Sequence, residues 1–543
     1  MSREDLRQEL WHRDIWHRAG RGLHAVTLIA ALGAVSWSLP AAAQSQGEAD
    51  TETNEIAGTE TEAPLTTDIA QYDNGGIYEG TFRDGLQHGQ GTYRLPNGYE
   101  YTGEWVDGEI QGQGQATFPD GAVYEGSFVA GKPEGTGRIV FADGSSYEGQ
   151  WQDGRINGEG LVEYANGVRY EGGFADALHS GRGVMTSPNG YRYEGDWVDG
   201  FKDGRGRITY PDGAVYEGDL GEGLRDGIGR LELADGVVYE GEWQDGEITG
   251  RGVLSQPNGD VYEGALVEGR REGEGVVRYA NGDRYEGTFA NDQRHGFGRF
   301  TSPDGYAYEG DWLEGQIEGE GRVTYPDGAV YEGSFRADVA HGQGVITYAD
   351  GTTYQGDWVD GVIEGNGVAR YANGLIYEGA FLNARQHGQG VMTLPLDADP
   401  SAVADIDVAL DEADGAETEG AASALPEAAE GQVFRYRYEG NWRDGLRHGQ
   451  GAATYGDGSV YEGEFVDGAR AGTGTLSMPD GFTYAGAWAE GEINGTGTAT
   501  YASGDVYEGE FVNGSREGQG VMRYATGETV DGTWGNGQLL SDN

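Results

Sequence analysis

Residues 101–123 read YTGEWVDGEIQGQGQATFPDGAV, and Tyr124 opens a closely similar stretch of the same length. Counted from the first tyrosine as position 0, glycine recurs at positions +2, +11 and +13 in all 18 copies, and Phe or Trp occupies +4 in 16 of them. The position-0 tyrosines return every 23 residues, with one interruption, at Tyr78, Tyr101, Tyr124, Tyr147, Tyr170, Tyr193, Tyr216, Tyr239, Tyr262, Tyr285, Tyr308, Tyr331, Tyr354, Tyr377, Tyr438, Tyr461, Tyr484 and Tyr507. A fixed period of this length predicts an array of repeated supersecondary units.

Each copy contains two segments with the alternation expected of β-strands. Side chains at positions 0, +2 and +4 share one face of an extended chain, as do those at +13, +15 and +17, because the strand period is two. The Asp-Gly or Asn-Gly pair at +19 and +20, such as Asp120-Gly121, predicts a two-residue type I′ turn between one repeat and the next. The longer segment from +6 to +11, such as residues 107–112, would join the two strands within a repeat.

Every strand would then pair with its neighbours in sequence. The predicted fold class is all-β, an elongated single-layer antiparallel β-meander of tandem 23-residue β-hairpin repeats. The glycines at +2 and +13 fall on the aromatic face, where their missing side chains leave room for a tyrosine or tryptophan ring to lie flat against the backbone. No single hairpin could bury such a face, so neighbouring repeats must stabilise one another by stacking.

The N-terminal segment has the three parts of an export signal. Residues 1–22 carry five arginines, residues 23–39 are uncharged and mostly apolar, and Pro40 then precedes Ala-Ala-Ala-Gln. This order predicts a signal peptide over residues 1–43, cleaved after Ala43. The apolar run has 17 residues, somewhat short of the ~20 that a spanning helix needs, so an uncleaved anchor is the alternative.

The rest of the chain divides by composition. Residues 44–70 are acidic with little apolar content, which predicts a disordered spacer. The array would occupy 71–395, as a half-repeat cap followed by repeats 1 to 14. Residues 396–435, acidic and rich in alanine, predict a disordered insertion. Residues 436–543 would hold repeats 15 to 18 and a terminal half-repeat, and the pattern leaves open whether the sheet continues across the insertion.

Charge and composition restrict the partners. The formal net charge is −56, from 92 acidic and 36 basic residues. Such a chain offers no basic face for nucleic acid, and its charge disfavours binding to anionic lipid. The absence of cysteine excludes disulfides, thiolate zinc sites and a cysteine nucleophile.

Histidines are too far apart to form a metal site. The six beyond the signal segment occupy +9 or +10, which the pattern places in the same loop of different hairpins: His88, His179, His295, His341, His387 and His448. Most are two or more repeats apart, or ~20 Å at ~4.8 Å per strand, whereas zinc ligands lie within about 2.1 Å of the metal. We therefore predict no metal site.

Carboxylates recur at +1 on the face opposite the rings. Their spacing of about 10 Å only touches the upper limit for paired acid and base catalysis, and cross-strand arginines explain them as surface charges. We therefore predict no catalytic residue and no enzyme. No cofactor is expected either. Weak surface binding of Ca²⁺ stays open because acidic turns are numerous, although the specific calcium-loop signatures are absent.

Tryptophan at +4 has two interpretations. Core packing is the first, and a groove left open along the ring face for a peptide or glycan is the second, since exposed aromatic surface favours contact. The candidate groove residues are Trp105, Trp151, Trp197, Trp243, Trp312, Trp358, Trp442 and Trp488.

The units resemble MORN repeats. Residues 101–108 read YTGEWVDG and 461–468 read YEGEFVDG, and the following His-Gly-Gln-Gly occurs, for example, at 88–91 and 341–344. The resemblance covers residues 78–395 and 436–534. It implies an elongated, twisted antiparallel sheet with a groove, and a scaffold that binds peptide segments, self-associates or tethers membranes. No segment outside the repeats resembles an attached catalytic domain.

These observations together predict an exported, non-catalytic repeat scaffold. It would lie in the periplasm or outside the cell, bind a protein partner or act as a rigid spacer in the cell envelope, and have self-association as a further option. The alternative is a membrane-associated array, held in the inner membrane by an uncleaved N-terminal helix and facing outward.

Overall fold

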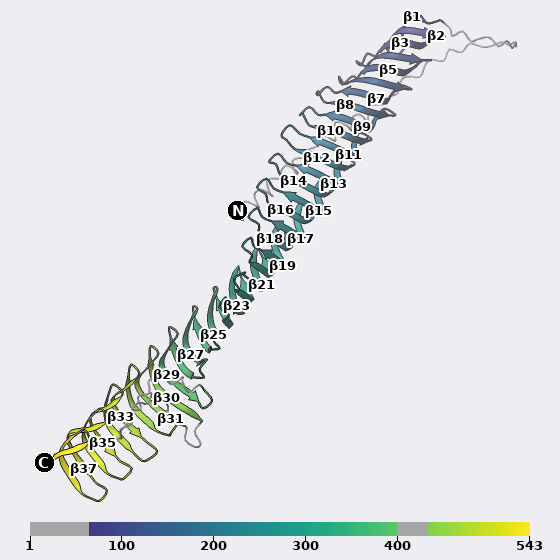
Figure 1. Cartoon of the computed structure of the whole chain (residues 1–543). Helices are drawn as coiled ribbons and strands as arrows, with labels where there is room; N and C mark the ends of the chain where they lie inside the picture. Colours follow the sequence, from purple (N-terminus) through teal and green to yellow (C-terminus); the bar gives the residue numbers. More distant parts are fainter. Residues whose placement is uncertain (1–63, 399–432, 543) are drawn as a thin grey trace. The chain divides into compact units, whose positions relative to one another are not determined.

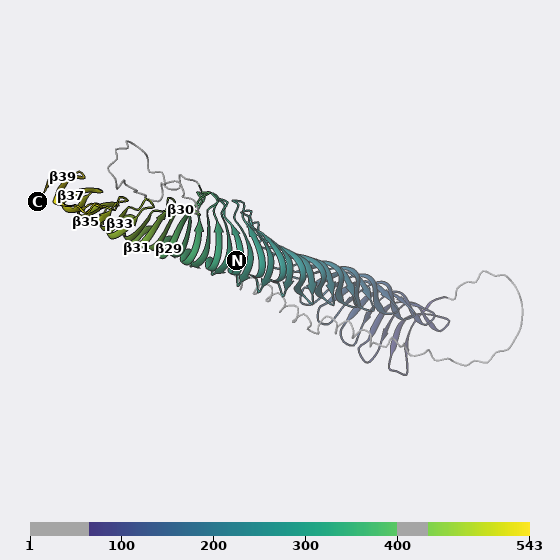
Figure 2. The same ribbon diagram turned by 90° about the horizontal axis from the view of Figure 1, so that it is seen from below.

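The computed structural model describes residues 64–398 and 433–542. These residues form 39 antiparallel strands and no helix, so none of them forms a helix able to cross a membrane. The chain divides into two compact units, Met1–Ala280 and Asn281–Asn543. Figure 1 shows the strands of each unit following one another in chain order, and the view from below shows them in one layer (Figure 2).

Unit 1 contains β1 Thr66–Gln71, β2 Ile77–Arg83, β3 Leu86–Arg94, β4 Glu100–Val106, β5 Glu109–Thr117, β6 Val123–Val129, β7 Lys132–Val140, β8 Ser146–Gln152, β9 Arg155–Glu163, β10 Arg169–Ala175, β11 Leu178–Thr186, β12 Arg192–Val198, β13 Phe201–Thr209, β14 Val215–Gly221, β15 Leu224–Glu232, β16 Val238–Gln244, β17 Glu247–Ser255, β18 Val261–Val267 and β19 Arg270–Arg278.

Unit 2 contains β20 Arg284–Ala290, β21 Gln293–Thr301, β22 Ala307–Leu313, β23 Gln316–Thr324, β24 Val330–Arg336, β25 Val339–Thr347, β26 Thr353–Val359, β27 Val362–Arg370, β28 Ile376–Leu382, β29 Arg385–Pro395, β30 Phe434–Arg443, β31 Leu446–Tyr455, β32 Val460–Val466, β33 Ala469–Ser477, β34 Thr483–Ala489, β35 Glu492–Thr500, β36 Val506–Val512, β37 Ser515–Arg523, β38 Thr529–Gly535 and β39 Gln538–Asp542. The predicted meander of antiparallel hairpin repeats is confirmed. We number the repeats from Tyr78, so each repeat contributes one shorter and one longer strand.

A column of glycines crosses each unit. Gly103 at +2 lies opposite Gly114 at +13 of its own repeat, and Gly114 in turn lies opposite Gly126 of the next. A Cβ added at Gly114 would meet the ring of Tyr101, whose hydroxyl donates a hydrogen bond to the carbonyl of Glu104 at 3.0 Å. The prediction that these glycines make room for a flat-lying ring is therefore confirmed.

Aromatic rings interlock from one repeat to the next. The ring of Tyr124 meets Phe128 of its own repeat edge to face at 5.0 Å, and meets Trp151 of the following repeat at the same distance. All three rings are buried. Such edge-to-face pairs add about 0.5–1.5 kcal/mol each beyond burial, so the rings couple each hairpin to the next.

The tight turn lies in a different place from the one predicted. Asp107 and Gly108, at +6 and +7, have φ of 48° and 89° and form the two-residue turn between β4 and β5. Two positive φ angles define a type I′ turn. The prediction of this turn at +19 and +20 is therefore wrong, and the segment that was expected to be a loop from +6 to +11 is mostly strand.

The predicted turn sequence instead belongs to a longer connection, residues 118–122. Gly121 N–H donates to the Phe118 carbonyl at 2.9 Å, and Phe118 N–H donates to the Ala122 carbonyl at 2.8 Å. Gly121 has φ of 93°, whereas Asp120 is not in the left-handed region and its carboxylate accepts the Ala122 N–H at 3.0 Å. This is a type I turn closed by a left-handed glycine, the three-residue hairpin loop.

The glycine found at +11 in every repeat lies in a β-bulge. The register between β4 and β5 shifts between Gly103 and Trp105, which leaves extra residues on β5. Gly112 takes φ of 75° in this bulge, a conformation that glycine adopts without steric cost.

The array begins earlier than the sequence predicted. β1 pairs with β2 over its whole length, Thr66 opposite Phe82 through Gln71 opposite Ile77. Residues 66–70 therefore belong to the terminal half-repeat and not to the predicted spacer 44–70. At the other end, β39 adds a further strand after the expected half-repeat. The rest of the spacer up to residue 63 and the predicted signal peptide 1–43 lie outside the described residues.

The sheet continues across the predicted insertion 396–435. β29 pairs with β30 from Gly388 opposite Trp442 to Pro395 opposite Phe434. The indole N–H of Trp442 donates to the Gly390 carbonyl at 3.2 Å, as in repeats that have no insertion. Residues 434–435 are thus part of β30, and residues 399–432 lie outside the described part of the chain.

Candidate functional site

The tryptophans of the predicted groove lie in the core. Their exposed fractions run from 3% to 7%: Trp105, Trp151, Trp197, Trp243, Trp312, Trp358, Trp442 and Trp488. In six of them the indole N–H donates to a glycine carbonyl of the preceding repeat, as Trp243 does to Gly229 at 3.2 Å. The structure therefore shows the packing role, and partner contact by these rings stays a prediction.

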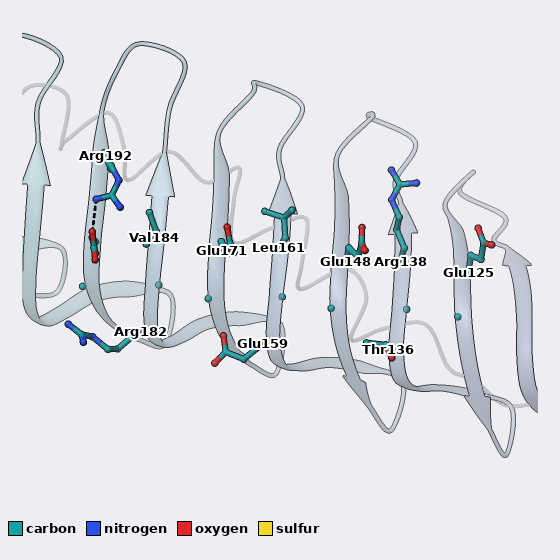
Figure 3. A pocket seen from close by; sticks show the side chains of 18 of the residues that line it. Glu125, Thr136, Arg138, Glu148, Glu159, Leu161, Glu171, Arg182, Val184 and Arg192 are labelled. Atoms are coloured by element: carbon teal, nitrogen blue, oxygen red, sulfur yellow. Dashed lines mark hydrogen bonds and ion pairs between the residues drawn. The ribbon is translucent and has the colours of Figure 1, made fainter.

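An open groove lies on the opposite face of unit 1 (Figure 3). It crosses β5 to β12, encloses about 1200 Å³ and has the glycine column as its floor. Residues next to these glycines point away from the rings because strand side chains alternate. One wall consists of residues at +1 and +14, namely Glu125, Arg138, Glu148, Leu161, Glu171, Val184 and Glu194. The facing wall comes from position +12 and consists of Gln113, Thr136, Glu159 and Arg182.

The first wall carries a row of glutamates on alternate strands. Glu194 is bound by Arg192 at 2.6 Å, and this hydrogen bond holds the pKa of the Glu194 carboxyl below its usual value. Glu171 has Arg169 at 3.5 Å. By contrast, Glu148 forms no ion pair with another described residue, and the same is true of Glu125. Two of the four carboxylates are therefore available to a cation from outside.

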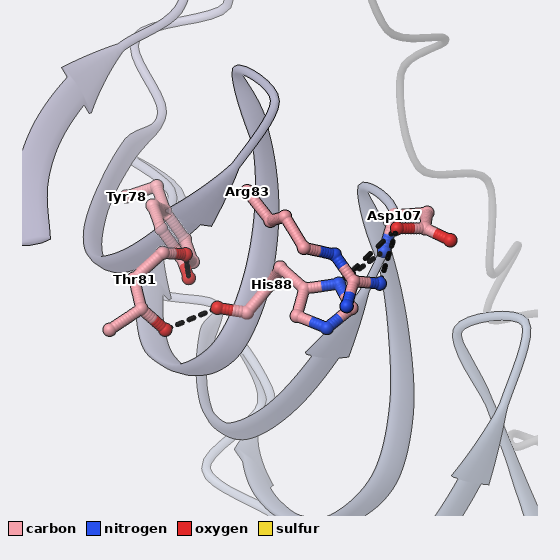
Figure 4. A network of polar contacts seen from close by, with 5 residues as sticks. All are labelled: Tyr78, Thr81, Arg83, His88 and Asp107. Carbon is pink, nitrogen blue, oxygen red and sulfur yellow. Dashed lines mark hydrogen bonds and ion pairs between the residues drawn. The ribbon is translucent and has the colours of Figure 1, made fainter. Parts of the chain in front are cut away.

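Three of the histidines at +10, His88, His341 and His448, link one repeat to the turn of the next, as Figure 4 shows for His88. His88 Nδ1 lies 3.3 Å from the backbone nitrogen of Asp107 and 3.2 Å from its carboxylate, which Arg83 also approaches at 3.3 Å. His341 and Asp360 repeat this arrangement in unit 2. Asn157 does the same work in its repeat, accepting the Asp176 N–H at 2.9 Å. The role is therefore structural, and sequence reasoning missed it because the two residues are 19 apart.

No metal site appears among the described residues. The structure contains no group of three or more His, Asp or Glu side chains in residues 64–398 and 433–542 that could hold a metal ion.

All six described histidines lie in strands and not in the predicted loop, and His179 is the buried one among them. It belongs to β11, is 6% exposed, and stacks on Tyr170 with ring centroids 3.7 Å apart. A hydrogen bond of 2.9 Å joins its Nε2 to the Tyr164 hydroxyl. Position +9 enters the core because the turn before it has two residues only. Burial lowers the pKa of His179 to about 3.

Lys202 occupies position +9 of the next repeat. Its ammonium donates to the Tyr191 hydroxyl and lies 4.7 Å from the centre of that ring. Burial lowers the pKa of Lys202 to about 8. Arg225, at +9 of repeat 7, instead donates to the Gly246 carbonyl at 2.7 Å and stacks on Trp243. These cations lie among the rings, so they contribute to packing on the ring face. They do not line the groove on the opposite face.

A model of the MORN repeat family matches 18 segments of the chain: 78–98, 101–123, 124–146, 147–169, 170–190, 193–215, 216–238, 239–261, 262–284, 285–305, 308–330, 331–353, 354–376, 377–395, 438–460, 461–483, 484–506 and 507–529. No curated protein matches the chain.

Several solved structures share local similarity. The TCP10 domain of Danio rerio CPAP is 20% identical, over 40% of this chain and 93% of that domain, with a TM-score of 0.20. The TCP domain of Drosophila melanogaster SAS-4, solved with a proline-rich motif of Ana2, is 15% identical over 33% of this chain and 85% of its own, with a TM-score of 0.19. A streptogramin B lyase covers 55% of this chain and 91% of its own at 12% identity, with a TM-score of 0.10. TM-scores this low do not bear on function.

Proposed function

Because this chain belongs to the MORN-repeat family, we propose that it is an exported, non-catalytic scaffold that binds protein segments across its strands. The groove on the face opposite the rings carries this proposal. The ring face is filled by its own side chains, whereas the glycine-floored groove of unit 1 offers a concave surface to a partner. A repeat scaffold of this kind presents one long surface rather than a single reactive pocket.

The arrangement of the groove suits binding better than catalysis. Equivalent carboxylates such as Glu125 and Glu148 stand on alternate strands, or about 9.6 Å apart. They are exposed to solvent, so neither lies in the apolar pocket that a catalytic acid occupies. Spaced surface charges of this type give specificity and a fast association rate.

Export is the second part of the proposal. The order of basic, apolar and small residues in 1–43 supports export. An exported scaffold would bind its partner, or act as a rigid spacer, in the cell envelope. We expect the native protein to begin at Gln44, which mass spectrometry of its N-terminal peptide would check. Recovery of residues 1–43 on the native protein would contradict cleavage and favour the inner-membrane-anchored alternative.

The groove itself is tested by charge reversal. We expect the double variant Glu148→Lys, Glu171→Lys to lower recovery of the bound partner from envelope extract by at least about tenfold, because two contacts of about 1 kcal/mol each become repulsive. Recovery is quantified by mass spectrometry against the unaltered chain. The matched control is Glu109→Lys, Glu247→Lys, which makes the same charge changes at two exposed +8 residues of unit 1 that do not line the groove.

The control should leave recovery unchanged. Equal loss in both double variants would show that overall charge governs recovery and would contradict a site in the groove. Circular dichroism of all three proteins establishes that the strands remain folded, since all four glutamates are exposed.

A further inference from the structure

The groove has a period that selects the conformation of its occupant. Resting on the function proposed above, we propose that it binds a polyproline II segment of a partner that carries a positively charged side chain at every third residue. Three features of the groove support this choice: the spacing of its four glutamates, the absence of an ion pair at two of them, and the apolar residues that lie between glutamates in the second part of the row.

The glutamate spacing matches a polyproline II helix. Glu125, Glu148, Glu171 and Glu194 stand on β6, β8, β10 and β12, so neighbours in this row are about 9.6 Å apart at ~4.8 Å per strand. A polyproline II helix has three residues per turn and a rise of about 3.1 Å, which returns a side chain to the same side every ~9.3 Å. Over the three intervals of the row the mismatch accumulates to about 1 Å.

Other backbone conformations fit less well. An extended β-strand returns to the same side every two residues, or about 6.7 Å, and its third residue points away. An α-helix returns every seven residues, or about 10.5 Å, which accumulates to nearly 3 Å of mismatch over the same row. The groove therefore favours the three-residue period.

Charge selects cations at that period. Glu125 and Glu148 have no ion-pair partner among the described residues, and the whole chain carries a net charge of −56. Arg138 lies opposite both of them across the strands. Arg138 is the one cation in the row between Glu125 and Glu148. It should therefore repel the positively charged side chains of the occupant and weaken binding at these two glutamates.

Apolar residues fill the alternate positions of the row. Leu161 lies opposite Glu148 and Glu171 on its two neighbouring strands, and Val184 lies opposite Glu171 and Glu194. Both line the groove and are half-buried. They offer the uncharged residues of the occupant a surface halfway between the carboxylates, so the row alternates acidic and apolar sites over repeats 4 to 6.

The test compares two peptides with the same composition. One is four copies of Lys-Pro-Pro, and the other has the same residues with its lysines adjacent. We expect the full-length protein to bind the periodic peptide at least about tenfold more tightly by fluorescence anisotropy at physiological salt, because only that peptide places a lysine at each glutamate. Equal binding of the two peptides would overturn the proposal, since it would show charge attraction without register.

Protein variants locate the site. Glu148→Gln with Glu171→Gln should lower the affinity for the periodic peptide at least about tenfold. Arg138→Leu, which introduces the residue type of Leu161, should raise that affinity. The matched control Glu109→Gln with Glu247→Gln neutralises two exposed glutamates at +8 and should change nothing. Loss in the control equal to loss in the groove variant would also overturn the proposal.

The two proposals can fail separately. If neither peptide binds while Glu148→Lys with Glu171→Lys still abolishes partner recovery, the groove remains a protein-binding site and its occupant is of another kind. The opposite outcome is also possible: the periodic peptide binds and the glutamine and leucine variants change its affinity as expected, but the lysine variants leave partner recovery unaffected. The groove then binds polyproline II segments as proposed, and the envelope partner binds elsewhere.

Discussion

At pH 4, repeat 5 should be about 3 kcal/mol less stable than at pH 7, because the folded chain must keep His179 uncharged. Burial lowers the pKa of His179 from 6.5 to about 3. The unfolded state binds a proton below about pH 6.5, whereas the folded state does not until about pH 3, so the stability of the folded state falls as the pH falls through this window. A neighbouring aromatic cluster, Tyr170 and Trp197, supplies no compensating negative charge.

Hydrogen exchange of β10 and β11 at pH 7 and pH 4, corrected for the intrinsic rate, measures this loss locally. Local measurement is needed because a repeat array does not unfold in a two-state manner. The control is His179→Ile, which introduces the residue found at +9 in six other repeats, Ile110, Ile156, Ile248, Ile317, Ile363 and Ile493. If the variant lost as much protection on acidification as the unaltered chain, carboxylate titration elsewhere would be the cause and our account of His179 would be wrong.

Replacing Gly137 by alanine should cost about 3 kcal/mol, because the added methyl group overlaps a buried ring. Gly137 has an ordinary strand conformation, and a Cβ there would lie 2.5 Å from Cε2 of Tyr124 and closer still to its hydroxyl. The ring would have to leave its place between Phe128 and Trp151 and lose its hydrogen bond to the Ser127 carbonyl. Hydrogen exchange of β6 and β7 at pH 7 would measure the loss locally, because the array does not unfold in a two-state manner.

Gly144→Ala provides the comparison. Gly144 has φ of 89° and nothing within 4 Å of its added Cβ, so alanine there costs only the left-handed backbone, about 1–2 kcal/mol. Gly137→Ala should therefore be the more destabilising of the two. A smaller effect at Gly137 would mean that Tyr124 can move aside freely, and the ring would then not explain the glycine at +13.

Much of the fold could be predicted from the spacing of a few residue types. Alternation along Tyr101, Gly103 and Trp105 places all three on one face, because strand side chains alternate whatever the surroundings. The glycine at +13 is likewise explained by the sequence alone, since only a missing side chain lets a ring lie against the backbone. These are local rules, and the structure confirms them in both units.

The turns could not be assigned in the same way. Asp-Gly occurs at 107–108 and again at 120–121, and the pair is compatible with a type I′ turn and with the end of a three-residue loop. The choice depends on the cross-strand register, which places Trp105 opposite Ile110 and leaves room for only two residues between β4 and β5. The same register decides that His179 points into the core.

The sequence by itself determined the period, the strand faces, the glycine column and the wide separation of equivalent side chains that argues against catalysis. Only the tertiary structure decided which face is filled. Alternation assigns Trp151 and Glu148 to opposite faces but does not say which face has room for a partner, because burial depends on how neighbouring hairpins and their loops pack over the rings. That packing encloses Trp151 at 3% exposure and leaves the groove beside Glu148 open, so the face opposite the rings is where we propose that a partner binds.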